Sequence, residues 1–173
     1  MKSTFIALAQ ALATLPSRAQ NDYREDVASV DQIIASLYAV ISGEKGEVRN
    51  WDRFRNLFVA EARLIPTNKN PEGVTGYRIL TPADYIASAG QRLEKLGFHE
   101  VEINRQVAQY GSMVHVWSTY ESYHSKTEAK PFARGINSIQ LMHDGTRWWI
   151  LQIYWLGETP ENPLPPEFLP MKR

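Results

Sequence analysis

Hydrophobic residues in the first half of the chain recur every three or four positions, which is the spacing of one face of a helix. One such segment follows Ser29, which forms a capping-box pattern with Gln32. A second, short segment follows Asn50, a favourable cap residue. A third begins at Thr81, with a proline and an acidic residue in its first turn, and ends at Gly97. The pattern predicts three helices before residue 98.

After Gly97 the period changes to the alternation that is typical of strands. The Asp144-Gly145 pair between two apolar runs predicts a tight hairpin. Helices that precede strands indicate an α+β fold in which the helices cover one face of an antiparallel sheet. We expect strands at residues 62–66, 101–109, 113–123, 132–142 and 147–156, and a proline-rich, extended tail at 158–173.

Pairing Met142 with Arg147 across this hairpin sets its register and therefore the two faces of the sheet. Both faces are then largely apolar, although a sheet covered by helices on one side should be polar on the other. A large exposed apolar face is unusual in a monomer, so we expect a homodimer. In this register one face carries Arg134, Ile136, Ser138, Leu151, Ile153 and Trp155, and the face expected in the dimer carries Asn137, Ile139, Ile150, Gln152 and Tyr154.

Residues 1–19 have the features of a signal peptide, because an apolar stretch after Lys2 is followed by small residues at Ser17 and Ala19. An amphipathic N-terminal helix is the alternative. With cleavage we expect a periplasmic or secreted protein, and without it a cytoplasmic one. The chain then divides into the signal peptide at 1–19, an extension at 20–28, one domain at 29–157 and the tail at 158–173.

The composition excludes several classes of function. The 173 residues hold 19 basic and 19 acidic side chains, so a basic nucleic-acid-binding surface is not indicated. The absence of cysteine removes thiolate chemistry and cysteine-ligated metals. The four histidines are well separated, and no glycine-rich nucleotide-binding motif is present. We therefore expect no metal, no cofactor, no nucleic-acid partner and no membrane span.

The sequence contains three short motifs: Asn50-Trp51-Asp52-Arg53-Phe54, then Ala62-Arg63-Leu64, then Asp144-Gly145 followed by Trp148 and Trp155. Together with the order of elements, they resemble the nuclear transport factor 2-like superfamily, which includes SnoaL-like polyketide cyclases, ketosteroid isomerase and scytalone dehydratase. The resemblance covers about residues 29–157. It implies three N-terminal helices packed on a strongly curved antiparallel sheet, a cone of the cystatin-like type. The segment 132–141 is similar to an exported bacterial subfamily of unknown function.

The resemblance also implies that the catalytic residues of ketosteroid isomerase are missing. The general-base aspartate falls at Pro66, the oxyanion-hole acid at Ser138, and the first-helix tyrosine near Ala35 or Ser36, with Tyr38 out of register. The same alignment implies that the face with Ser138 lines the cone. We therefore expect a ligand pocket between the sheet and the helices, lined by Trp51, Arg55, His115, Trp117, Thr119, Glu121, Arg134, Ser138 and Trp155.

His115 and Arg134 are the weak candidates for catalysis in this pocket. A histidine titrates near neutrality and can act as a general acid or base, and an arginine can clamp a carboxylate or phosphate. The alternatives are a structural, hydrogen-bonded His115 and an ion pair of Arg134 with Glu121 or another acid. For the aromatic residues the alternative is a plain core, and for Arg55 it is a surface salt bridge.

Three functions follow from these expectations. The favoured one is a protein that binds a small apolar or amphipathic molecule in the cone without catalysis. The second is a cofactor-free lyase, isomerase or cyclase that uses His115 and Arg134. The third is a dimerisation module whose cone is filled by its own side chains.

Overall fold

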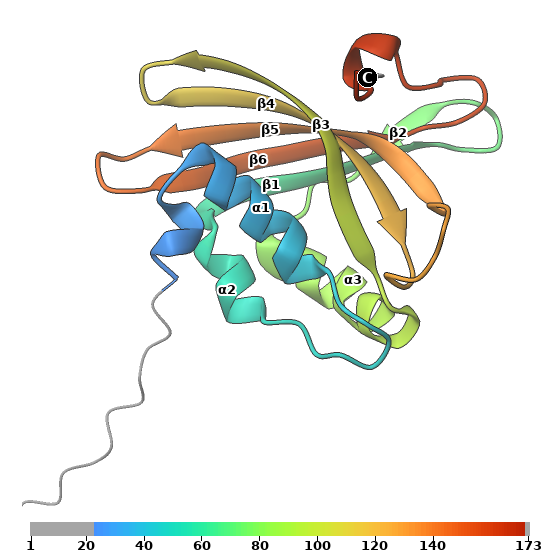
Figure 1. Ribbon diagram of the computed structural model, residues 1–173, viewed down its shortest axis with the longest axis horizontal. Helices are drawn as coiled ribbons and strands as arrows, with labels where there is room; N and C mark the ends of the chain where they lie inside the picture. Colours follow the sequence, from blue (N-terminus) through green and yellow to red (C-terminus); the bar gives the residue numbers. More distant parts are fainter. Residues whose placement is uncertain (1–22, 172–173) are drawn as a thin grey trace, which may run out of the picture.

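Three α-helices and a six-stranded sheet make up residues 23–171, the part of the chain that a computed structural model describes (Figure 1). The expected signal peptide at 1–19 lies outside the described residues, and the cellular location stays a prediction. In chain order the elements are η1 (Glu25–Val27), α1 (Val30–Ile41), α2 (Trp51–Asn56), β1 (Phe58–Lys69), β2 (Thr75–Tyr77), α3 (Pro82–Leu96), β3 (His99–Tyr110), β4 (Met113–Tyr123), β5 (Ala133–His143), β6 (Trp148–Gly157) and η2 (Pro166–Phe168).

Each α-helix begins at the cap residue that the sequence predicts. The side chains of Ser29, Asn50 and Thr81 accept hydrogen bonds from backbone N–H groups in the first turns of α1, α2 and α3. Asp84 completes a capping box by accepting a hydrogen bond from the backbone N–H of Thr81. Gly97 follows α3 with a φ of 76°, a conformation that favours glycine. The prediction of three helices is confirmed.

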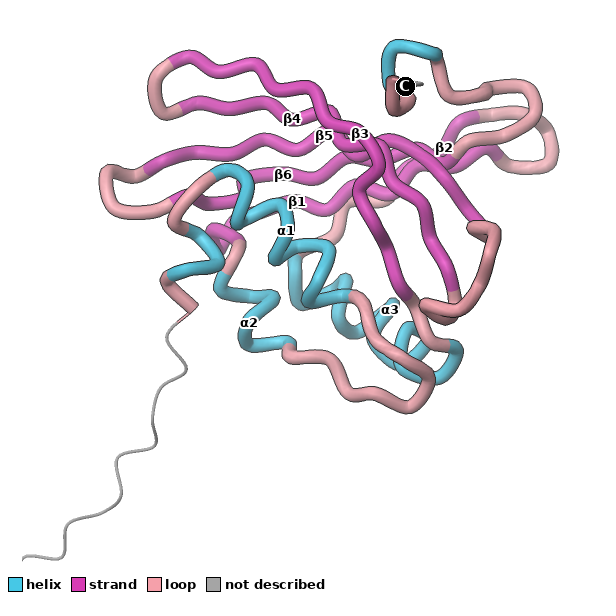
Figure 2. The backbone as a smooth tube through the Cα atoms, in the orientation of Figure 1, coloured by secondary structure: helices cyan, strands magenta, loops and turns pink. Residues whose placement is uncertain are grey.

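The strands form one curved sheet in the order β2-β1-β6-β5-β4-β3 (Figure 2). All neighbouring strands are antiparallel except β1 and β6, which run parallel. The α+β cone is therefore confirmed, and the sheet is mixed rather than wholly antiparallel. Pro66 does not stop the first strand, because pairing with β6 carries β1 to Thr67 and pairing with β2 carries it on to Lys69.

The last hairpin turns at Asp144-Gly145 as predicted, but its register differs. Met142 pairs with Trp149 rather than with Arg147. The carboxylate of Asp144 fixes this turn, because it accepts hydrogen bonds of 2.8 and 2.9 Å from the backbone N–H groups of the two residues after Gly145. The predicted partner of Met142 on β6 therefore differs from the observed one by two residues.

A bulge in β6 then exchanges the faces of all the residues beyond it. The pairing of β5 with β6 skips Leu151, so Asn137 pairs with Trp155 and Ser138 pairs with Tyr154. A bulge places one extra residue in one strand, and the alternation of the sequence does not reveal it. The predicted sets of residues on the two faces are therefore wrong for this half of the hairpin.

The helices cover the face that carries Asn137, the opposite of the prediction. Ile139 and Ile153 share this face and are 0% and 5% exposed. The face with Ser138 and Tyr154 points away from the helices. A dimer through Asn137 is therefore wrong, because that face is the interior, and a homodimer through the outer face stays a prediction.

The C-terminal tail lies on the outer face of the sheet (Figure 1). The carbonyl group of Phe168 accepts a hydrogen bond of 2.7 Å from Thr119 Oγ1, and its ring packs edge-on against Trp117. Gln106 Nε2 donates a hydrogen bond of 2.8 Å to the carbonyl group of Glu167. The tail thus buries part of the second apolar face within the same chain.

A buried arginine joins the ends of α1 and α3. Arg49 is 4% exposed, and its guanidinium donates to the carbonyl groups of Ile41 at 2.9 Å, Gly43 at 2.7 Å and Leu93 at 3.2 Å. Carbonyl groups at helix C-termini lack helical partners and favour a cation. A Cβ atom at Gly43 would lie 2.3 Å from the guanidinium, so this contact requires glycine. Arg49 therefore helps to set the spacing of α1 and α3 under the sheet.

We predict that Arg49→Met lowers the free energy of unfolding by about 3 kcal/mol, because it leaves several buried carbonyl groups without donors. Urea unfolding followed by circular dichroism measures the change. Arg78→Met, which removes an exposed arginine before α3, is the matched control and should change stability by less than about 0.5 kcal/mol. Equal effects of the two substitutions would contradict the proposed role of Arg49.

Candidate functional site

The curved sheet and the helices enclose a cavity of about 220 Å³. An engineered protein cavity of about 150 Å³ binds benzene, so this space accommodates one substituted ring. Its wall is mostly apolar and comes from all three helices and from β1 and β3 to β6. The polar residues on the wall are Tyr85, Arg92, Glu100, Tyr120, Ser122 and Asn137.

Glu100 brings a carboxyl group to the apolar wall of this cavity. It lies near the start of β3 opposite Ser122 of β4, whose hydroxyl group donates a hydrogen bond of 3.0 Å to the carboxylate. Burial raises the pKa of Glu100 to about 7, and hydrogen bonds from Ser122 and Asn137 offset only part of the rise. Near neutral pH the carboxyl group can therefore either donate or accept a proton.

A chain of hydrogen bonds fixes the orientation of Asn137. Ser118 donates its hydroxyl proton to the carboxylate of Glu102, which Arg105 holds at 2.9 Å. Because that proton is used, the hydroxyl group of Tyr38 must donate to Ser118 Oγ, 2.6 Å away. The oxygen of Tyr38 then accepts a hydrogen bond of 3.0 Å from Asn137 Nδ2. Asn137 Oδ1 has no hydrogen-bond partner among residues 23–171, so it is the group that this residue offers to the cavity.

Two tyrosines add hydroxyl groups to the cavity wall. Tyr85 of α3 and Tyr120 of β4 have no hydrogen-bond partner for these groups within the described part of the chain. Burial, followed by the charge of Glu100, raises the pKa of both residues, so the hydroxyl groups keep their protons at neutral pH. Gly135 provides the space for Tyr120, because a Cβ atom there would lie 2.5 Å from Tyr120 Oη.

Arg92 supplies a positive charge at the solvent side of the cavity. It is seven residues after Tyr85 and three after Ala89, so it lies on the stripe of α3 that faces the cavity. Its side chain is exposed and also borders a surface depression outside the cavity. Arg92 forms no hydrogen bond or ion pair with another residue in the range 23–171. Its guanidinium is therefore available to a ligand.

Most of the residues predicted to line this cavity lie on the outer face of the sheet instead. His115 Nε2 is 2.9 Å from Ser138 Oγ, and the imidazole ring packs edge-on against Trp117. Trp117 and Ser138 line a different cavity of about 180 Å³ between the sheet and the tail. Their predicted place on the cone wall is wrong, and His115 has the hydrogen-bonded setting of its structural alternative.

Arg134 also lies on the outer face, and it is held by acidic residues. Two of its nitrogen atoms donate to Glu158 at 2.8 and 3.0 Å, and a third lies 3.8 Å from Glu121. Thr119 is on this face as well and binds the tail. Arg134, Glu121 and Thr119 therefore do not line the cone cavity, and the ion pair expected as the alternative for Arg134 is present.

The other three predicted residues divide between the cavity and its surroundings. Trp155 lines the cavity and meets Tyr85 edge-on at 6.5 Å between ring centroids. Trp51 packs against Phe54 at the partly buried edge of the core. Arg55 forms the exposed ion pair with Asp52 that was its alternative. Only Trp155 of the predicted set thus lines the cavity.

Sequence reasoning missed Asn137 because it assigned the wrong inner face of β5. The alignment placed the cavity-facing position of β5 at Ser138, and the structure places it at Asn137, one residue earlier. A signal was present in the buried tyrosine of α1, because Tyr38 needs a polar partner inside the fold and Asn137 supplies it. Glu100 gives a weaker signal, since an acidic residue that begins a strand is commonly exposed.

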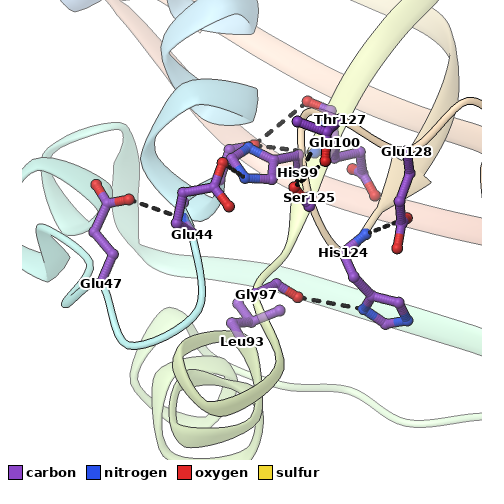
Figure 3. A network of polar contacts seen from close by, with 12 residues as sticks. Glu44, Glu47, Leu93, Gly97, His99, Glu100, His124, Ser125, Thr127 and Glu128 are labelled. Atoms are coloured by element: carbon purple, nitrogen blue, oxygen red, sulfur yellow. Dashed lines mark hydrogen bonds and ion pairs between the residues drawn. The ribbon is translucent and has the colours of Figure 1, made fainter.

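A second polar cluster lies where the loop after α1 meets the start of β3 (Figure 3). His99 Nε2 is 3.1 Å from a carboxylate oxygen of Glu44, whose backbone N–H donates to Glu47 at 2.8 Å. His124 Nδ1 is 3.4 Å from the carbonyl oxygen of Gly97 (Figure 3). These contacts join loops to one another, and no group of His, Asp or Glu residues within 23–171 has the arrangement of a metal site.

No helix in the same range is long and apolar enough to cross a membrane.

We predict that Glu100→Gln stabilises the protein at high pH and not at low pH. The pKa of Glu100 rises from its ordinary value of 4.5 to about 7 on folding, so the folded state keeps a proton that the unfolded state loses. The free energy of unfolding therefore falls as the pH rises from about 4.5 to about 7, by up to about 3 kcal/mol. Removing the acid should recover this difference at pH 8 and change little at pH 4.

Urea unfolding of both proteins at pH 4, 6 and 8 measures this difference. Glu61→Gln, which removes an exposed carboxylate from β1, is the matched control. A stability difference for Glu100→Gln that is the same at pH 4 and pH 8 would contradict the raised pKa.

No family model matches the chain, and no curated protein matches it in sequence. Several solved structures match its fold. A protein of unknown function from Nostoc punctiforme with a cystatin-like fold gives a TM-score of 0.56 at 8% identity, over 76% of this chain and 90% of that chain. A protein of unknown function from Mycobacterium tuberculosis gives a TM-score of 0.55 at 11% identity, over 78% of this chain and 77% of that chain. An NTF2-like protein from Cytophaga hutchinsonii gives a TM-score of 0.52 at 12% identity, over 75% of this chain and 99% of that chain. At these identities the similarity shows the fold alone: the chain has the cystatin-like fold of the nuclear transport factor 2-like proteins.

Proposed function

We propose that the protein binds a small molecule, about the size of one substituted ring, in the cone cavity. The observation that carries this proposal is the carboxyl group of Glu100 at an apolar cavity wall. Burying an acid in this way raises its pKa to about 7 and destabilises the folded protein at neutral pH. Binding sites commonly hold groups that reduce stability, because their hydrogen-bonding capacity is kept for a ligand.

The other wall groups support the same function. Tyr85, Tyr120 and Asn137 line the cavity, and the two hydroxyl groups and Asn137 Oδ1 have no hydrogen-bond partner among residues 23–171. A concave apolar space with a few convergent polar groups is the usual form of a small-molecule site. These groups give the ligand an apolar body and more than one hydrogen-bonding substituent.

Ala89→Phe should abolish binding, because Ala89 lines the cavity and the added ring fills it. Ala87→Phe is the matched control, since Ala87 lies on the same helix but outside the cavity. Ligand-observed NMR with phenol, benzyl alcohol, benzoate and the hydroxybenzoates should detect at least one ligand of the unsubstituted protein and of Ala87→Phe, and none of Ala89→Phe. Melting temperatures establish that both variants are folded. Binding of no compound, or equal binding to both variants, would contradict the proposal.

Proton transfer by Glu100 is the second candidate function. His115 and Arg134 lie on the outer face, so an enzyme that works in the cone needs another acid or base. A carboxyl group whose pKa is about 7 is suited to general acid–base catalysis at neutral pH. With a carbonyl ligand, Glu100 would take a proton from the carbon beside the carbonyl group, and a tyrosine hydroxyl would donate a hydrogen bond to the carbonyl oxygen.

If this candidate is correct, the protein should speed the exchange of the methyl hydrogens of acetophenone in D₂O. The exchange rate should rise with pH through about pH 7, because the ionised carboxylate is the base. Glu100→Gln should reduce the rate to that of buffer, while Glu61→Gln should not change it. Proton NMR measures the rate, and equal exchange with and without the protein would exclude this reaction for acetophenone while leaving the binding proposal in place.

A further inference from the structure

The cavity has two chemically different ends. At one end, Glu100 and Asn137 present oxygen atoms. On the solvent side, Arg92 presents a guanidinium group that has no acidic partner among the described residues. Most of the remaining lining is apolar and includes Trp155 and Phe132. A ligand that satisfies both ends needs a hydrogen-bond donor at one end and a negative charge at the other.

The hydrogen-bond chain leaves Asn137 an acceptor rather than a donor for a ligand. Because Glu102 is held by Arg105 and takes the proton of Ser118, the whole chain points its protons toward Glu102. The amide N–H groups of Asn137 consequently donate to Tyr38 and to Glu100, and its Oδ1 is left for the ligand. A hydroxyl or N–H group of the ligand can donate to this oxygen in either protonation state of Glu100.

The solvent end fits an anion better than a neutral group. A guanidinium forms two parallel hydrogen bonds with a carboxylate, and such pairs are stronger than neutral hydrogen bonds. Arg92 stands on the stripe of α3 that otherwise contributes Tyr85, Ala89 and Leu93 to the cavity. Lys95, one turn further on, borders only the outer depression and is not part of the cavity wall.

We propose that the ligand is a small ring-containing carboxylate with a hydroxyl or N–H donor, whose carboxylate pairs with Arg92 at the mouth and whose donor binds Asn137 and Glu100 inside. This proposal rests on the proposed binding function and names the chemical class of the ligand. Arg92 is the specificity-determining residue for the charge of the ligand, and Asn137 for its donor.

The test compares the affinities of 3- and 4-hydroxybenzoate with those of the corresponding hydroxybenzamides, which have the same shape and no charge. Isothermal titration calorimetry at pH 6 is performed on the full chain, on Arg92→Gln and on Lys95→Gln. At least one hydroxybenzoate should bind the unsubstituted protein about tenfold more tightly than its amide. Arg92→Gln should bring the two affinities within about threefold. Lys95→Gln removes the same charge from the same helix and should preserve the tenfold preference.

Benzoate and Asn137→Leu test the inner end. Benzoate lacks the donor and should bind more weakly than the better hydroxybenzoate, and Asn137→Leu should remove that difference. Equal binding of the acids and amides, or a preference that Arg92→Gln leaves unchanged, would overturn this proposal while the binding of neutral rings would still support the proposed function. If no ring compound binds at all, the proposed binding function is contradicted, and the proposed class of ligand fails with it.

Discussion

The curvature of the sheet is the constraint on which the cavity depends. The pairing of the strands that form the concave wall is interrupted at three places: at Ile103 of β3, at Leu151 of β6, and between Phe58 and Arg63 of β1. A bulge bends the strand that contains it and increases the local twist. The sheet curves around the side on which the helices lie (Figure 1), and Arg49 joins the ends of α1 and α3 on that side. The helices do not fill this concave side, and the cavity of about 220 Å³ remains between them and the sheet.

The same bulge in β6 decides which side chains reach this space. Without it, alternation would place Trp155 on the face of Arg134 and Ser138, where it would lie outside the cone. With it, Trp155 joins Asn137 on the inner face. The bulge in β3 has a comparable effect, because Glu100 and Glu102 precede it and face inward, whereas Asn104 beyond it pairs with outward-facing Thr119. Curvature and the polarity of the cavity therefore have a common origin.

The elements that depend on local chemistry could be predicted from the sequence. Ser29, Asn50 and Thr81 each cap a helix through their own side chains, and Asp144-Gly145 makes a turn by itself. The resemblance carried by these elements was sufficient for the fold. The faces of the strands depend instead on register and bulges, which arise from packing between segments far apart in the chain.

The candidate site was mispredicted for the same physical reason. His115 and Arg134 were expected in the cone because they share the face of Ser138, and the structure places Asn137, one residue earlier on β5, on the inner face instead. One partner of Arg134 also comes from beyond the expected domain: Glu158 belongs to the segment predicted to be an extended tail. A single sequence contains no sign that this tail returns to the sheet.

The polar groups of the cone argue against a cavity that exists only as a defect of packing. A purely structural cone would bring its hydroxyl groups together, as Tyr38 and Ser118 do at 2.6 Å on one side of the cavity. Tyr85 and Tyr120 face the same space without such partners, and Gly135 leaves room for the hydroxyl group of Tyr120 where any larger residue would displace it. Hydroxyl groups that line a cavity without protein partners are satisfied only by water or a ligand. The hydroxyl groups of Tyr38 and Ser118 are thus paired with each other, whereas those of the cavity-lining Tyr85 and Tyr120 have no protein partner among the described residues.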